Sequence, residues 1–588
     1  MNEVSLDYIR HLKPASHRPG KELLQEGIEL GKTIKAGRSG FIRSQQTYAN
    51  HMEYKKDLAR QGKIYFNILL GLATLEEQIK AIKEIYAFTQ RTGLEVNCIQ
   101  AIPSGLVALP REYREKAPAT TSFEMFEMED YEAQASAAPL DITFNDYHLF
   151  SPNAVENTIF ALQSGSPRIG DMTQFFWSYA GFDDEEKRLS DVVKAMGIVA
   201  SKRDEMFAAE TYLDDGYPGY FLDCASYVGY ALLEHYICTK LCGARYTISF
   251  GGLLSENDTR VGVAMALDKL MSTEEQPVLT YLNSSTNLQW DHDIHGNYGI
   301  SVSEFLFEML VEKKYHMSLG INPVSITEKI KVPTLEELMN ILSAAKRTEE
   351  KVEEWLPYFN FEPLEKMRDV MAGEGRKFFE NVLEGFKEAG IDTEDPLELL
   401  MVLKNMNPIR FEQIFHSSTY GTDNQEIKPF YPTVLGRQTL EMKEEIVAEL
   451  LQQGNKDVLK GKKVIAASGD AHTYGLVLVE GVLNDMGAEV INGGVDLDPV
   501  DMLDLADEEN TRFIGISCHN GQALDYGHQI LELAKKRRKD YWIFMGGKLN
   551  AILPGDSEPV EIGDKLMEMG IHAENDIALT VKQISNED

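Results

Sequence analysis

From Lys462 onward, short apolar runs alternate with stretches in which apolar residues recur at helical spacing. This alternation predicts parallel β–α–β units that build an open, doubly wound, flavodoxin-like sheet. The apolar runs are 464–468, 489–492, 513–517 and 542–545, and the helical patterns between them are 476–486, 500–506 and 528–537.

Residues 1–415 show the same alternation over a longer stretch. Seven or eight β–α units here favour an N-terminal (β/α)8 TIM-type barrel over one long open sheet, because eight strands close on themselves. The fold class is therefore α/β, and a helical tail, 335–402, is expected to pack around the barrel. Turn-rich segments follow many of the strands, and barrel enzymes keep their chemistry in such loops. The expected strands are 64–70, 95–100, 141–144, 206–211, 246–250, 278–282 and 316–321, and the clearest helices are 75–92, 185–200, 220–242 and 260–271.

The chain is expected to hold two domains joined by a linker, because 588 residues exceed what one hydrophobic core supports. Residues 416–432 are polar and rich in turn residues, which indicates an exposed connector. A helical segment, 438–453, then leads into the second domain. We place the catalytic barrel at 1–415, the linker at 416–458 and the second domain at 459–588.

The chain carries 93 acidic and 58 basic residues, a net charge of −35. Phosphate backbones and anionic lipids would repel such a surface, so we expect no nucleic-acid or membrane partner. Five scattered cysteines do not form a disulfide framework. Neither a signal peptide nor an apolar stretch of membrane-spanning length is found. We therefore expect a cytoplasmic enzyme that forms a symmetric homo-oligomer.

The motif Gly469-Asp470-Ala471-His472-Thr473-Tyr474-Gly475 directly follows the first strand of the second domain. An imidazole can offer one ring nitrogen to a metal while a nearby carboxylate fixes the other nitrogen as N–H. The alternative is a helix N-cap beside an ordinary polar loop. The motif resembles the Asp-x-His-x-x-Gly signature of cobalamin-binding domains. That resemblance implies a cobalamin cofactor, with His472 as the axial cobalt ligand, Asp470 as its support, and Gly475 letting the next helix start close to the cofactor.

Two further segments agree with this resemblance. The family has a Ser-x-Leu after its third strand and a Gly-Gly after its fourth, and this chain has Ser517-Cys518-His519 and Gly546-Gly547 there. The resemblance implies that Ser517 borders the buried tail of the cofactor and that the paired glycines let the tail pass close to the backbone. His519 stands where the family usually has leucine, which puts the lining of the tail pocket in question.

A barrel followed by this domain resembles the adenosylcobalamin-dependent mutases of the glutamate mutase class, and within it the single-chain 2-methyleneglutarate mutases. The segments 14–20, 40–45 and 328–334 carry the likeness. It implies that Glu328 contacts the adenosyl ribose, although a carboxylate near a helix N-terminus is the alternative. It also implies a radical carbon-skeleton rearrangement that interconverts 2-methyleneglutarate and 3-methylitaconate.

The same resemblance implies a substrate site built from Arg43, Arg111, Arg168 and Tyr179. Guanidinium groups pair with carboxylates through two hydrogen bonds, which suits a small dicarboxylate substrate. The glutamate that binds the substrate ammonium in glutamate mutase has no counterpart in 174–179. A pocket without that partner suits a dicarboxylate that lacks an amino group.

Alternatives remain for the function and for two loops. A glutamate mutase with both subunits fused is one, and a corrinoid methyl-transfer protein is another, although 427–455 is too short for the helical cap of the latter. The loop 290–297 holds two histidines, His292 and His295, and two carboxylates, Asp291 and Asp293. A metal site, a contact with the substrate or corrin, and plain loop structure are the alternatives. The segment 146–148 could also contact the corrin.

Overall fold

The computed structural model divides the chain into two compact units, Met1–Val434 and Leu435–Asp588. Each unit is described below by itself. The structure describes residues 3–114, 122–179, 182, 184–205, 207–273, 277–284, 290, 292–328, 333–422, 427–454, 456–469, 474–494, 497–518, 523–547, 549–551, 560–573 and 576–587.

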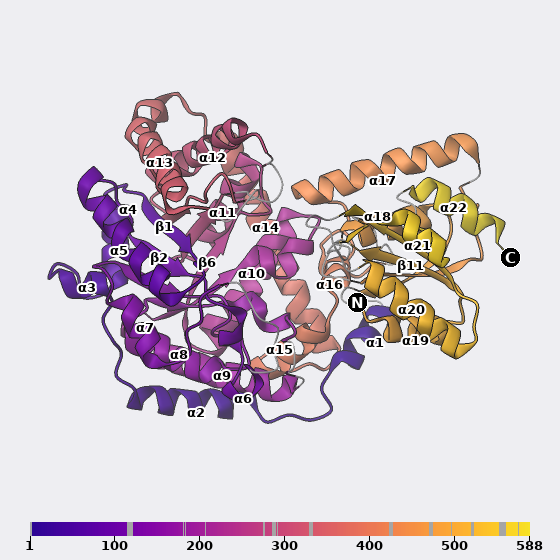
Figure 1. Ribbon diagram of the computed structural model, residues 1–588, viewed down its shortest axis with the longest axis horizontal. Helices are drawn as coiled ribbons and strands as arrows, with labels where there is room; N and C mark the ends of the chain where they lie inside the picture. The colour runs from indigo at the N-terminus through magenta and orange to yellow at the C-terminus, as the bar shows by residue number, and fades with distance from the viewer. Residues whose placement is uncertain are drawn as a thin grey trace. The chain divides into compact units, whose positions relative to one another are not determined.

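The first unit is built on a closed barrel of eight parallel strands (Figure 1). Each strand pairs with the next in the sequence, and β8 closes the barrel by pairing with β1, where Tyr65 lies opposite Gly320. The predicted (β/α)8 barrel is thus confirmed. The strands are β1 (Tyr65–Leu70), β2 (Cys98–Ala101), β3 (Asp141–Phe144), β4 (Arg168–Ile169), β5 (Ala208–Tyr212), β6 (Arg245–Phe250), β7 (Leu279–Asn283) and β8 (Leu319–Asn322).

Helices separate the strands and surround the barrel. The longer ones begin at capped residues; Thr74, for example, accepts a hydrogen bond from the backbone N–H of Glu77 at the start of α5. The barrel helices are α5 (Leu75–Thr92), α6 (Arg111–Arg114), α7 (Met128–Ala135), α8 (Ala154–Ser164), α9 (Glu185–Ser201), α10 (Cys224–His235), α11 (Asn257–Met271), α12 (Ile294–Tyr315) and α13 (Leu335–Trp355).

Further helices precede the first barrel strand in the sequence, and others follow α13. Helix α2 packs so closely on α9 that a Cβ on Gly27 would lie 3.0 Å from the Cα of Gly197. Helix α14 packs against α10 and α11, as expected for the helical tail. The extensions are α1 (Glu3–Leu12), α2 (Gly20–Thr33), α3 (Gly40–Ser44), α4 (His51–Arg60), α14 (Glu362–Glu388), α15 (Pro396–Asn405) and α16 (Pro408–Phe415).

The segment after α16 differs from the expected exposed connector, because it is fastened to the barrel unit. Asp223 is fully buried and accepts hydrogen bonds from the backbone N–H groups of Phe430 and Tyr431, each at 3.1 Å. It also accepts from the backbone N–H of Ala225 at 3.1 Å and contacts His416 Nε2 at 2.9 Å. His416 itself is only 2% exposed. One buried carboxylate therefore holds the end of the first unit in place.

We predict that Asp223→Ala releases this segment. The substitution leaves two partly buried backbone N–H groups without their acceptor, and each costs at most about 1–3 kcal/mol when unpaired. Limited proteolysis followed by mass spectrometry should then show cleavage within 416–434 at least several-fold faster than in the unmodified protein. Asp204→Ala, at an exposed position of the same unit, is the control. Equal cleavage rates in all three proteins would contradict the prediction.

The second unit is a parallel four-stranded sheet in the order β10-β9-β11-β12. This order matches the predicted flavodoxin-like sheet. A small antiparallel pair, β13 (Asn550–Ala551) and β14 (Val560–Glu561), follows it. The main strands are β9 (Lys463–Ser468), β10 (Glu489–Gly494), β11 (Phe513–Cys518) and β12 (Trp542–Gly547), and the helices are α17 (Val434–Gln453), α18 (Tyr474–Asp485), α19 (Pro499–Glu508), α20 (Ala523–Arg537), α21 (Gly563–Met569) and α22 (Ile577–Asn586).

Two hydrophobic clusters lie in this second unit, one holding residues of α19 and α20 and the other residues of α17, α18 and α22. Within the described part of the chain, no helix has the length and apolar character needed to cross a membrane.

Candidate functional site

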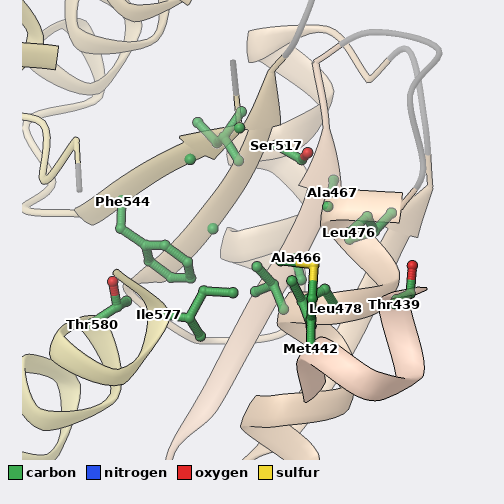
Figure 2. Close-up of a pocket in the computed structure, with 16 residues that line it drawn as sticks. Thr439, Met442, Ala466, Ala467, Leu476, Leu478, Ser517, Phe544, Ile577 and Thr580 are labelled. Atoms are coloured by element: carbon green, nitrogen blue, oxygen red, sulfur yellow. The ribbon is translucent and has the colours of Figure 1, made fainter. Parts of the chain in front are cut away.

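A pocket of about 350 Å³ lies in the second unit between the sheet and its covering helices (Figure 2). Its floor exists because small residues occupy neighbouring strands. Gly515 of β11 pairs in register with Ala466 of β9, and Ser517 pairs with Gly546 of β12. The ring of Phe544 extends over Gly515, where an added Cβ would lie 2.3 Å from it. The ring thus fills the space above Gly515, and the small residues Ala466, Ser517 and Gly546 leave room for a ligand beside it.

Helices from three parts of the unit form the walls. Helix α18 contributes Leu476, Leu478 and Val479, α22 contributes Ile577 and Thr580, and α17 contributes Thr439 and Met442. The walls are therefore mostly apolar. A pocket of this size and character, with few polar groups, is typical of small-molecule and cofactor sites.

The structure brings together four of the residues predicted to bind the cofactor. Gly475, Ser517, Gly546 and Gly547 all line this pocket. Parallel strands end at one edge of a sheet, so residues near the ends of β11 and β12 and at the start of α18 meet there. The predicted ligand His472 and its support Asp470 lie outside the described residues, as does His519.

Sequence reasoning did not find the other lining residues. Phe544 could have been found from the alternation within β12, because it lies on the same face as Gly546 two residues later. Thr439 and Met442 on α17, and Ile577 and Thr580 on α22, carry no motif. Only the packing of the helices places them at the pocket.

The polar content of the pocket fits the tail of a cobalamin. Ser517 is 5% exposed, and its hydroxyl oxygen has no hydrogen-bond partner in the structure. A buried hydroxyl without a partner is costly, so a ligand with one polar atom at this point would satisfy it. The aromatic base of a cobalamin tail has an apolar body and one free ring nitrogen, which matches this lining.

A family model described as B12 binding domain matches residues 463–573. This range contains β9 to β12 and the whole floor of the pocket. Residues 463–573 are a B12-binding domain. The B12-binding domain therefore follows an eight-stranded barrel on one chain, and it supports a cobalamin cofactor.

Solved structures with similarity to the chain include two of pyruvate carboxylase from Rhizobium etli. Its carboxyl transferase domain with oxalate is 11% identical over 72% of this chain, with a TM-score of 0.31. A variant crystallised without acetyl coenzyme A is 12% identical over 71% of this chain, with a TM-score of 0.29. The chain spans 59% and 41% of these two proteins. No curated protein matches the sequence.

The C-terminal end of the barrel is ringed by polar side chains. Gln100 is the penultimate residue of β2, Asn145 follows β3, and Asn283 and Asn322 end β7 and β8. Asn322 Nδ2 donates to Asn283 Oδ1 at 2.6 Å. Asn145 is 1% exposed, and neither of its amide atoms has a hydrogen-bond partner. This end of the barrel therefore offers hydrogen-bonding groups that the protein itself does not satisfy.

Carboxylates follow three neighbouring strands at the same end. Burial, together with the nearby charge of Glu210, raises the pKa of Asp146, after β3, to about 6. The pKa of Asp215, after β5, is raised to about 8 by burial and by the nearby charges of Asp146 and Asp214. Asp171, after β4, accepts hydrogen bonds from Tyr212 N and Thr173 Oγ1, and so holds the loops. Near neutral pH, Asp146 is therefore mostly charged and accepts hydrogen bonds, whereas Asp215 keeps its proton and can donate one.

Glu328 follows β8 at this C-terminal end, where the resemblance places a contact with the adenosyl group. Its side chain is exposed, yet the surrounding protein removes enough hydration to raise its pKa to about 7. A carboxyl group near this pKa exchanges its proton near neutral pH and can donate or accept a hydrogen bond.

The three predicted substrate arginines do not converge. Arg43 donates to the carbonyl of Ala135, which lies in the sequence before β3 and hence at the N-terminal end of the barrel. Arg111 is 87% exposed and lies 3.9 Å from Glu127. Arg168 points into the barrel and is ion-paired with Glu210.

Tyr179 is 9% exposed, and its hydroxyl has no partner. It packs with Phe182 and Leu109, and Arg188 lies 5.4 Å from its ring centroid. Its contact with the substrate stays a prediction.

In the loop 290–297, the described residues support a structural role. Trp290 is buried at 1% exposure, and Asp293 caps α12 by accepting from His295 N at 3.1 Å. Among the described residues, no group of three or more histidine, cysteine, aspartate or glutamate side chains could hold a metal ion. His148, in the other loop, is fully buried, and burial lowers its pKa to about 4, so it is neutral.

Proposed function

We propose that the protein is an adenosylcobalamin-dependent isomerase that rearranges the carbon skeleton of a small acid. The observation that carries this proposal is a B12-binding domain with an apolar pocket, on one chain with a barrel whose C-terminal end holds unsatisfied polar groups. In the proposed enzyme, Ser517 and the glycines around it hold the cofactor tail. His472 binds the cobalt, and Asp470 orients that imidazole.

When bound, adenosylcobalamin supplies a carbon radical by homolysis of its cobalt–carbon bond. The role of the protein is to hold the substrate at the barrel mouth and to exclude water and oxygen. Glu328 is proposed to hold the adenosyl ribose. The amides of Gln100, Asn145 and Asn283 are proposed to orient the substrate through hydrogen bonds.

Two substrates follow from the resemblance, and the barrel mouth bears on the choice. The first is 2-methyleneglutarate, which carries two carboxylates and no positive charge. The second is glutamate, whose ammonium group would pair with the Asp146 carboxylate at the mouth, because a pKa of about 6 leaves that group mostly charged near pH 7. A corrinoid methyl-transfer protein is a separate candidate, and it would use methylcobalamin instead.

Electron paramagnetic resonance on the full chain tests these choices. Protein loaded with adenosylcobalamin under anaerobic conditions should give a cobalt(II)–radical signal when the true substrate is added. A signal with 2-methyleneglutarate alone supports the first substrate, and a signal with glutamate alone supports the second. Methyl transfer from methylcobalamin to a thiol, with no radical signal for either acid, would overturn the isomerase proposal.

We predict that His472→Ala abolishes the histidine-nitrogen coupling to cobalt. Protein labelled with nitrogen-15 histidine should show this coupling in its unmodified form and lose it in the variant. His528→Ala, an exposed histidine on α20 of the same domain, is the control and should keep the coupling. Asp470→Asn should keep the coupling and weaken cobalamin binding by about 10–100-fold. An unchanged spectrum in His472→Ala would remove the ligand assignment.

A further inference from the structure

The tail pocket extends beyond the residues that match the B12-binding family. The match covers 463–573, whereas Thr439 and Met442 precede it and Ile577 and Thr580 follow it. Figure 2 shows Thr439 and Met442 projecting from one helix, α17, beside the pocket. Two helices that flank the matched domain therefore complete the walls of the pocket.

Helix α17 is held in this position by packing farther along its length. Leu450 is 4% exposed and packs in the same cluster as Val482 and Leu483 of α18. Lys443 lies across α18, where a Cβ on Gly481 would lie 2.8 Å from its Cδ, and its Nζ is 3.2 Å from Asp485. The absence of a side chain at Gly481 lets the two helices approach.

Met442 is an exposed apolar residue of the kind that a bound ligand would cover. Its side chain is 50% exposed, although it is apolar and lines the apolar pocket. A ligand base seated on the floor of Ala466 and Gly515 would remove this apolar surface from water, which is favourable. The exposed methionine is thus explained by an occupied pocket.

The lining has little capacity for hydrogen bonds. Three of its side chains carry a hydroxyl, namely Thr439, Ser517 and Thr580, and the rest are apolar or glycine. The hydroxyl of Thr580 already donates to the carbonyl of Asp576 at 3.2 Å. The hydroxyl of Ser517 has no hydrogen-bond partner and so offers a free donor, and among the described lining residues no side chain carries an amide or a charge.

We propose that α17 is part of the cofactor site and that this lining selects cobamides with a benzimidazole base over cobamides with an adenine base. The proposal rests on cobalamin being the cofactor. A benzimidazole joined to its ribose has one free ring nitrogen, which the Ser517 hydroxyl can satisfy. Adenine would also bury an amino group and further ring nitrogens without partners, which is costly.

Absorbance titration of the full chain with three corrinoids tests the selectivity. Cobalamin carries dimethylbenzimidazole, adeninylcobamide carries adenine, and cobinamide lacks the tail. We expect cobalamin to bind at least about tenfold more tightly than either of the other two. Equal binding of cobalamin and adeninylcobamide overturns the selectivity. Failure of all three to bind overturns the proposed function itself, so the two failures are distinguishable.

Substitutions on α17 test its part in the site. Met442→Trp should fill the pocket and lower cobalamin affinity at least about tenfold, while cobinamide affinity stays unchanged. Ala448→Trp places the same side chain at an exposed position of the same helix and should change neither. Unchanged cobalamin affinity in Met442→Trp, or an equal loss with cobinamide, would show that α17 is not a wall of the tail pocket.

Discussion

Replacing Arg168 with methionine is expected to destabilise the barrel by about 3–5 kcal/mol, because it leaves a buried carboxylate without its partner. Arg168 and Glu210 are 2% and 1% exposed and form an ion pair inside the barrel. The guanidinium also donates to the Tyr281 hydroxyl at 2.7 Å and to Asn67 Oδ1 at 3.0 Å. Strands β1, β4, β5 and β7 are thus joined through one side chain.

Urea unfolding of the full chain, followed by circular dichroism, measures the effect. The double variant Arg168→Met with Glu210→Met should recover most of the loss, because no unpaired charge remains. Arg111→Met, at an exposed arginine, should stay within about 0.5 kcal/mol of the unmodified protein. A stable Arg168→Met protein that binds substrate poorly would instead support the substrate clamp predicted from the sequence.

Seven of the eight barrel strands were predicted from the sequence, because each has at least two apolar residues within a stretch of four or more. Strand β4 was missed, because it has only two residues, Arg168 and Ile169, between Pro167 and Gly170. Its inward residue is an arginine, so apolar patterning gives no signal there. Closure of the other strands into a barrel is what requires a strand at this position.

Part of the cofactor site was predictable because the order of the strands fixes where it lies. Strand topology alone brings Gly475, Ser517 and Gly546 to one edge of the sheet, so their order along the chain was enough. Met442 and Thr580 lie on helices whose packing no local pattern specifies. The arginines failed to converge because α3 lies near the start of β3, which puts Arg43 at the N-terminal end of the barrel.

Stability of the barrel unit should fall as the pH rises from about 5 to 8, because several buried glutamates are neutral in the folded protein. Burial raises the pKa of Glu312 from 4.5 to about 8, and burial also raises the pKa of Glu234 to about 7. Glu312 accepts from the backbone N–H groups of Met317 and Leu319, and Glu234 accepts from the Tyr246 hydroxyl at 2.8 Å. Between pH 4.5 and its own folded pKa, each glutamate binds more protons in the folded protein than in the unfolded chain.

The sign follows from that proton difference. The stability each glutamate contributes is complete below pH 4.5 and is lost as the pH rises through the folded pKa. The slope is up to about 1.4 kcal/mol per pH unit for each group. Glu234→Gln keeps a neutral acceptor for Tyr246 and should flatten the curve between pH 5 and 7, whereas Glu380→Gln, at an exposed position of α14, should leave it unchanged. Urea unfolding midpoints measured across this range check the slope, and a stability that rises toward pH 8 would show that these carboxyl groups are charged in the folded protein.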